Sequence, residues 1–129
     1  MGYLLDSCVF IDLMNGNPAI QNRIANEGLE NCYCCDIVLA ELFTGPYKSQ
    51  NDCHLKQVEW LEKRFRQLPF KDSYKTYARI RAFLERQGWK LDNMDMQIAS
   101  IAIDYDLTLV TSNLRHFDRI PGLKLEVWE

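Results

Sequence analysis

A chain of 129 residues is long enough to bury one hydrophobic core, so we expect a single domain over residues 1–129. Its 47% apolar and 26% charged residues exclude a disordered tail, and no apolar run approaches the roughly 18 residues of a membrane span. The net charge of −3 argues against a protein held to nucleic acid by a general positive surface. No basic segment precedes an apolar one at the N-terminus, as a signal peptide would require, so we expect a cytoplasmic protein.

Short apolar runs alternate with helix-like segments along the whole chain. The first run, residues 3–5, stops abruptly at Asp6, which is typical of a strand covered on both faces. Further strands are predicted at residues 32–35, 68–70, 107–111 and 123–128, and helices at 9–14, 19–27, 37–44, 49–67, 73–87 and 92–105, with a short turn or helix at 114–120. This order predicts an α/β fold of three layers, in which helices flank a mostly parallel sheet of about five short strands.

Individual residues predict where some of the helices begin and end. Asp36 is expected to cap the helix over residues 37–44, and Gly45-Pro46 is expected to end it. Asp92 stands where a cap would begin the helix over residues 92–105. The inner face of that helix is predicted from an apolar stripe at helical spacing, formed by Met94, Ile98, Ile101, Ala102 and Tyr105.

Five cysteines include three in one short segment, Cys32, Cys34 and Cys35. Neighbours along a strand point to alternate faces and do not pair easily with each other. The spacing also lacks the second pair of ligands that a zinc site needs. We therefore expect buried, reduced thiols.

Acidic residues distant in sequence are predicted to converge. Asp6 and Asn113 each follow a predicted strand, and Glu41 and Asp95 lie on helices that leave the same side of the sheet. Ligands of open parallel sheets bind beyond the carboxyl ends of the strands. Crowded carboxylates raise one another's pKa and destabilise a fold unless a cation offsets their charge. Oxygen ligands favour Mg²⁺ or Mn²⁺, and a metal-bound water directed at a phosphodiester is the usual chemistry of such a site.

Several segments, in this order, resemble a PIN-domain ribonuclease, and most closely the VapC toxins of bacterial toxin–antitoxin modules. They are Leu4-Leu5-Asp6-Ser7, the stretch 37–45 that holds Glu41, the stretch 95–99 that begins with Asp95, and the stretches 110–117 and 119–123. Each motif alone is weak, whereas all of them in order over the whole chain are specific.

The resemblance implies that Asp6, Glu41 and Asp95 hold Mg²⁺ or Mn²⁺ and position the attacking water. Its fourth acidic position falls within residues 111–118, where Asn113 and Asp118 are both candidates, and we favour Asp118.

Other positions around these acids match the family less directly. Ser7 and Thr111 match hydroxyl positions that orient carboxylates or water. Arg115 and His116 lie close enough in sequence to touch phosphate, and His116 is either a general acid or an ordinary surface histidine. Cys8 departs from the family, which commonly has asparagine or another small polar residue there, so a polar contact from this position is in doubt.

The resemblance further implies an endoribonuclease that cuts structured RNA, tRNA loops among them, and forms a homodimer neutralised by a VapB-like antitoxin. Four cations beside Trp89 form either an RNA-binding surface or a plain solvated helix face: Arg79, Arg81, Arg86 and Lys90. A non-catalytic PIN module that binds RNA or protein is the alternative. A phospho-acceptor domain lacks support, because its first strand would need an acidic pair. DNA stays open as a substrate.

Overall fold

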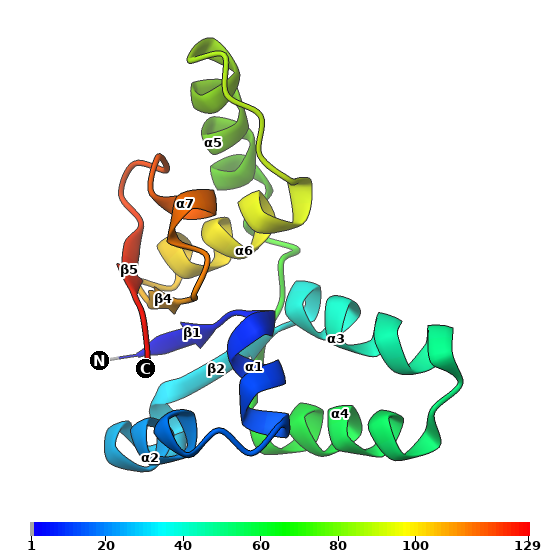
Figure 1. Cartoon of the computed structure of the whole chain (residues 1–129). Helices are drawn as coiled ribbons and strands as arrows, with labels where there is room; N and C mark the ends of the chain where they lie inside the picture. Colours follow the sequence, from blue (N-terminus) through cyan, green and yellow to red (C-terminus); the bar gives the residue numbers. More distant parts are fainter. Residues whose placement is uncertain (1) are drawn as a thin grey trace.

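The computed structural model describes residues 2–129, which form one parallel sheet flanked by helices (Figure 1). The strands are β1 (Tyr3–Leu5), β2 (Cys32–Cys35), β3 (Arg66–Leu68), β4 (Thr108–Val110) and β5 (Lys124–Glu126). Their order across the sheet is β3-β2-β1-β4-β5, and every neighbouring pair is parallel. The predicted α/β class and the parallel sheet of five short strands are confirmed.

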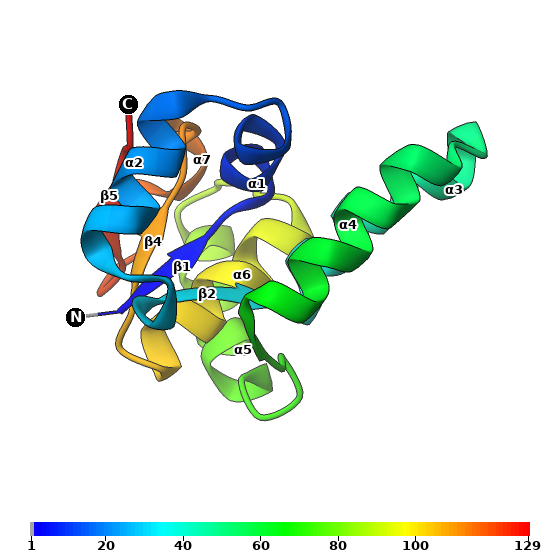
Figure 2. The ribbon, with the colours of Figure 1, turned by 90° about the horizontal axis from the view of Figure 1, so that it is seen from below.

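Helices cover both faces of this sheet. They are α1 (Ser7–Met14), α2 (Pro18–Glu27), α3 (Asp36–Ser49), α4 (Asp52–Arg64), α5 (Tyr74–Arg86), α6 (Asn93–Asp104) and α7 (Leu114–Phe117), with a 3₁₀ turn at Leu29–Asn31. In Figure 2, α1 and α2 lie on one side of the sheet and α5 and α6 on the other, while α3 and α4 extend side by side away from it. Within residues 2–129, no helix has the length and apolar character that crossing a bilayer demands.

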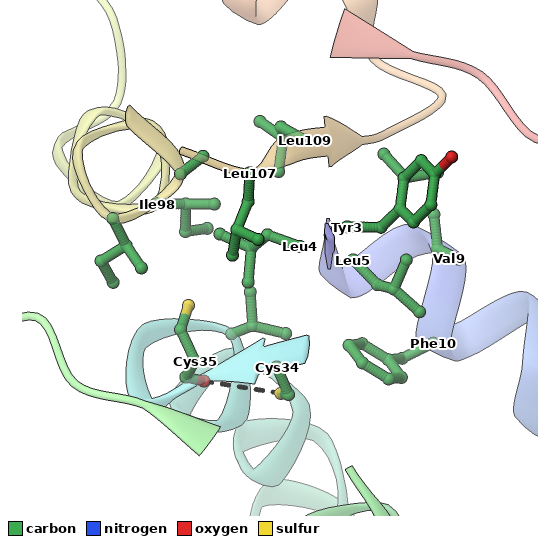
Figure 3. Close-up of a cluster of buried hydrophobic side chains, with 14 of the residues drawn as sticks. Tyr3, Leu4, Leu5, Val9, Phe10, Cys34, Cys35, Ile98, Leu107 and Leu109 are labelled. Carbon is green, nitrogen blue, oxygen red and sulfur yellow. Dashed lines mark hydrogen bonds between the residues drawn. The ribbon is translucent and has the colours of Figure 1, made fainter. Parts of the chain in front are cut away.

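The core lies on both sides of β1. Leu4 and Leu5 are fully buried and project to opposite faces, as neighbours along a strand do. Figure 3 shows Leu4 on the side of Ile98, from α6, and Leu5 on the side of Phe10, from α1. The strand is therefore apolar at every position, and the first polar side chain that follows it, Asp6, marks its end.

The path of α3 differs from its prediction. The helix runs through Gly45-Pro46 to Ser49, although Pro46 removes one helical hydrogen bond. Pro46 is buried, and α3 packs along α4 so closely that a Cβ on Gly45 would lie 3.4 Å from the His54 ring. Packing against a neighbouring helix therefore outweighs the local signal. The expected cap is also wrong, since the Asp36 carboxylate accepts a hydrogen bond from the Phe70 N–H, at 3.1 Å, instead of one from its own helix.

Two further boundaries were misplaced by the sequence pattern. Helix α4 ends at Arg64, and the following strand is Arg66–Leu68, two residues before the predicted piece at 68–70. Arg66 and Gln67 are exposed at the edge of the sheet, so the strand has no apolar signature. Tyr105, predicted to face inward, is 43% exposed, because α6 ends at Asp104.

All five cysteines carry free thiols, as expected. Cys32, Cys34 and Cys35 are buried in β2, where burial raises the pKa of Cys35 to about 12. These three thiols therefore serve the core as small apolar side chains.

The order of the strands also fixes where a ligand would bind. From β1 the chain first builds the sheet in one direction, through β2 and β3, and then returns to add β4 and β5 on the other side of β1. The order reverses between β1 and β4, and crevices at such a point hold the ligands of open α/β sheets.

Candidate active site

Asp6 stands at the carboxyl end of β1 and begins α1. Its backbone N–H donates to the carbonyl of Val110 on β4, at 2.9 Å, so the ends of the two central strands are joined at this residue. The Ser7 N–H donates to Asp6 Oδ1 at 2.8 Å, which makes the carboxylate the cap of α1. The side chain is 4% exposed, and its charge lies against the positive end of that helix.

Thr111 holds the other oxygen of this carboxylate. Its buried hydroxyl donates to Asp6 Oδ2 at 2.8 Å and accepts the Asn113 backbone N–H at 3.1 Å. Asn113 is thus linked to Asp6 through its backbone, whereas its side chain is exposed. These bonds lock the orientation of Asp6 before any ligand binds.

Cys8 also contacts Asp6, which the sequence did not predict. Its thiol lies 3.8 Å from Asp6 Oδ2 and 3.6 Å from the Thr111 hydroxyl, and it accepts the Ser112 N–H at 3.5 Å. The signal available in the sequence was position, because the second residue after a helix cap lies in the same first turn. A thiol thus makes weak polar contacts where the family commonly has a small polar residue.

Asp95 faces the same region from the first turn of α6. Asp92 caps that helix through a bond from the Met94 N–H at 3.4 Å, as predicted. Asp95 Oδ2 lies 3.1 Å from Nδ1 of His116, whose side chain is 57% exposed. Burial and the charge of Asp6 raise the pKa of Asp95, and the bond to His116 partly offsets them. His116 thus contacts Asp95 and remains open to solvent.

The surroundings of Glu41 disfavour its charged form. Its Oε1 is enclosed by protein and has no hydrogen-bond partner within residues 2–129. Burial raises the pKa of Glu41 to about 7, with further contributions from Asp6, Asp95 and Asp92 in that order. Acids from β1, α3 and α6 are therefore close enough to disfavour one another's charged forms. An enclosed and unpaired carboxylate oxygen beside two further acids suits an oxygen-liganded cation.

No three His, Cys, Asp or Glu side chains within residues 2–129 already form a set that could hold a metal ion. Cation binding would therefore draw Asp6, Glu41 and Asp95 closer together.

Asp118 lies apart from these acids. It is exposed at the end of α7, and it contributes to the pKa shift of neither Glu41 nor Asp95. Its role as a fourth acid stays a prediction.

A polar cavity of about 470 Å³ lies next to the acids. It is lined by Asn113, Arg115 and His116, together with the end of the chain at Val127 and Glu129. One of its lining residues, His116, bonds Asp95, and another, Ser112, follows Thr111 directly. The cavity therefore offers a guanidinium, an imidazole and an amide to a group bound at the acids.

Similarity to known proteins identifies the family of this chain. The PIN domain model matches residues 3–123, which include β1, the acids and β4. The chain belongs to the PIN-domain family.

This PIN domain is similar over its whole length to proteins named VapC. It is 33% identical to ribonuclease VapC2 of Rickettsia felis, over 100% of this chain and 99% of that protein. It is 31% identical to the tRNA(fMet)-specific endonuclease VapC of Shigella flexneri, over 98% and 97% of the two chains. Full-length similarity at this level places it among VapC-like PIN domains.

Solved structures agree with this assignment. The VapBC2 structure from Rickettsia felis, bound to a DNA fragment from its promoter, matches with a TM-score of 0.91 and 32% identity over 100% of both chains. A DNA-bound VapBC structure from Salmonella typhimurium matches with the same score and identity, over 100% of this PIN domain and 99% of that chain.

Proposed function

We propose that this PIN domain is a Mg²⁺- or Mn²⁺-dependent endoribonuclease and the toxin of a toxin–antitoxin pair, which hydrolyses phosphodiester bonds in structured RNA such as tRNA loops. The observation that carries the proposal is the enclosed and unpaired Oε1 of Glu41 beside Asp6 and Asp95. Relatives named ribonuclease and tRNA(fMet)-specific endonuclease support RNA as the substrate.

The residues of the site would have distinct roles. Asp6, Glu41 and Asp95 would hold the cation, because carboxylate oxygens are its preferred ligands and their mutual repulsion needs a positive charge. When bound, the ion supplies a more acidic water and an electrophilic partner for the phosphate. The backbone N–H of Ser7 and the side-chain hydroxyl of Thr111 each donate to one oxygen of Asp6, so that this carboxylate points in one direction. The role of the Ser7 hydroxyl stays a prediction.

His116 and Arg115 act on the substrate side of the acids. His116 holds Asp95 at 3.1 Å and stays exposed, so a neighbouring phosphate can reach its ring. Arg115 lines the same cavity and supplies a cation for the RNA backbone. Both residues thus favour an anionic polymer at a pocket that would otherwise repel it.

A protein partner is part of the proposal. Relatives of known structure are VapBC assemblies from Rickettsia felis and Salmonella typhimurium. We infer that a VapB-like antitoxin neutralises this chain, that the chain forms a homodimer, and that it acts in the cytoplasm, where its RNA substrate is found.

Cleavage should depend on the added cation. Purified protein is incubated with total RNA, with a tRNA pool and with single-stranded DNA, each with Mg²⁺, with Mn²⁺ or with EDTA, and the cut ends are mapped. We expect discrete cuts in RNA with either cation and none with EDTA, since the proposed reaction needs a bound cation to make the attacking water more acidic. Intact RNA under every condition would favour the non-catalytic binding module instead, and equal cutting of DNA would widen the substrate class.

A further inference from the structure

A second cavity, of about 500 Å³, lies between α5, the loop after it and the start of α6. We call it the Trp89 pocket. Leu84 and Met96, both buried, lie at its base, and Trp89 forms one wall. Arg81, Lys90 and Asn93 provide its polar rim. An apolar base, an aromatic wall and a cationic rim are the features of a site for an unpaired nucleobase.

The wall of this pocket is held in place. The Trp89 N–H donates to the carbonyl of Leu84 at 2.9 Å, which anchors the loop to the end of α5. The guanidinium of Arg119 lies 3.9 Å from the centre of the Trp89 ring. The first bond is made by the backbone N–H and orders the loop, whereas the ring itself is held by Arg119. The ring therefore loses less freedom when a base stacks against it than a mobile side chain would.

The rim is ordered as well. The Tyr77 hydroxyl donates to Asn93 Oδ1 at 3.1 Å, which leaves the amide N–H groups of Asn93 available to a ligand. Arg81 is held by Glu85 at 3.1 Å, and Lys90 is exposed. Of the four cations of α5, only Arg81 lines this pocket, together with its partner Glu85. Lys90, which forms no ion pair within residues 2–129, supplies the other positive charge of the rim.

The pocket adjoins the acids through α6. Met96 lies one helical turn after Asp92, the cap of α6, so these two residues share a face, and Asp95 lies in the same first turn of the helix. A nucleotide next to a phosphodiester held at Asp95 would therefore meet this pocket on one side, and the cavity with His116 serves the phosphate itself.

We propose that the Trp89 pocket binds the base of an unpaired nucleotide adjacent to the cleaved bond and thereby sets where RNA is cut. This inference rests on the proposed nuclease function and adds the residues that select the cleavage position. Chemistry favours RNA over a protein segment as the occupant, because the rim offers the Lys90 ammonium and the Asn93 amide donor around a stacking surface.

The test compares Trp89→Ala and Trp89→Phe with a matched control, Trp60→Ala. Trp60 is 51% exposed on α4 and also has an arginine, Arg64, over its ring, at 5.1 Å. Single-stranded RNAs that differ in the bases around one cut site are digested, the ends are mapped, and Mn²⁺ binding and the melting temperature are recorded for each variant.

We expect Trp89→Ala to lower cleavage about tenfold, mainly through a higher KM, and to weaken the preference at one position beside the cut. Trp89→Phe should restore most of both, Trp60→Ala should match the wild type, and Mn²⁺ binding should be unchanged. If Trp89→Ala does not fold, Asn93→Ala, at the exposed rim, should still alter that preference.

Three results would overturn the inference. An active wild type whose Trp89→Ala and Asn93→Ala variants cut the same positions at the same rate would remove the pocket from RNA selection and leave the nuclease intact. Unchanged cutting combined with lost neutralisation by the antitoxin would assign the pocket to a protein. A wild type that cuts no RNA would overturn the proposed function, and the inference with it.

Discussion

Asp6→Asn should lower RNA cleavage by about a thousandfold, the loss typical of removing one electrostatic partner from a reacting centre. Asp6 is the point where β1, β4 and α1 meet, and its two oxygens are fixed by Ser7 and Thr111. Asparagine keeps the shape and can still cap α1, but it removes a negative charge that the cation needs. The rate of cleavage of a defined RNA, measured under single-turnover conditions, checks this prediction.

Two further variants, Thr111→Val and Asp118→Asn, are compared with Asp6→Asn. Thr111→Val removes a bond to Asp6 but not its charge, so we expect a smaller decrease of about 10- to 100-fold. Asp118→Asn removes the predicted fourth acid. Because Asp118 is exposed and is not among the groups that raise the pKa of Glu41 or Asp95, we expect it to lower cleavage less than Asp6→Asn does. Cleavage equal to that of the wild type would contradict the role of Asp118 as the fourth acid.

Glu41→Gln should make the cation-free protein more stable than the wild type at pH 8, by about 1–2 kcal/mol after allowance for the partial exposure of Glu41. The pKa of Glu41 is about 7 in the folded chain, against an ordinary value of 4.5. Between these values the folded state binds more protons than the unfolded state, so wild-type stability falls as pH rises from 4.5 to 7. Glutamine removes this dependence, and the two proteins should be equally stable below pH 4.5.

Denaturant titrations in EDTA, repeated across this pH range, measure the difference in unfolding free energy. Glu59→Gln, at an exposed position of α4, is the matched control and should follow the wild type at every pH. Added Mn²⁺ should reverse the order at pH 8, since only the wild type retains the full carboxylate set. A Glu41→Gln protein less stable than the wild type in EDTA would contradict the crowding of acids at this site.

The sequence predicted the fold well where local signals and packing agree. Tyr3–Leu5 and Cys32–Cys35 are apolar throughout and form β1 and β2 as predicted. It failed where distant contacts decide, as at Pro46, which a neighbouring helix holds inside α3. Arg66 and Gln67 of β3 were also mistaken for helix, because an edge strand needs no apolar pattern.

At the candidate site, too, the sequence predicted what local signals determine and missed what distant contacts determine. The three acids were singled out because each breaks an apolar segment or begins a helix, and such signals are local. The contact of His116 with Asp95 was not predictable, since it depends on the orientation of side chains from separate elements. The contact of Cys8 with Asp6 was missed although both residues lie at the start of α1, where position alone was a signal. That the acids hold a cation stays a prediction of this work.

Direct titration of Mn²⁺, followed by electron paramagnetic resonance of the free ion, tests whether Asp6, Glu41 and Asp95 share a divalent cation. The wild type should remove Mn²⁺ from solution in stoichiometric amounts, and Asp6→Asn, Glu41→Gln and Asp95→Asn should each bind it at least about tenfold more weakly, because each removes a ligand. Glu59→Gln, at an exposed position of α4, serves as the control. A wild type that leaves the free Mn²⁺ signal unchanged, or three variants that bind as tightly as the wild type, would contradict the account.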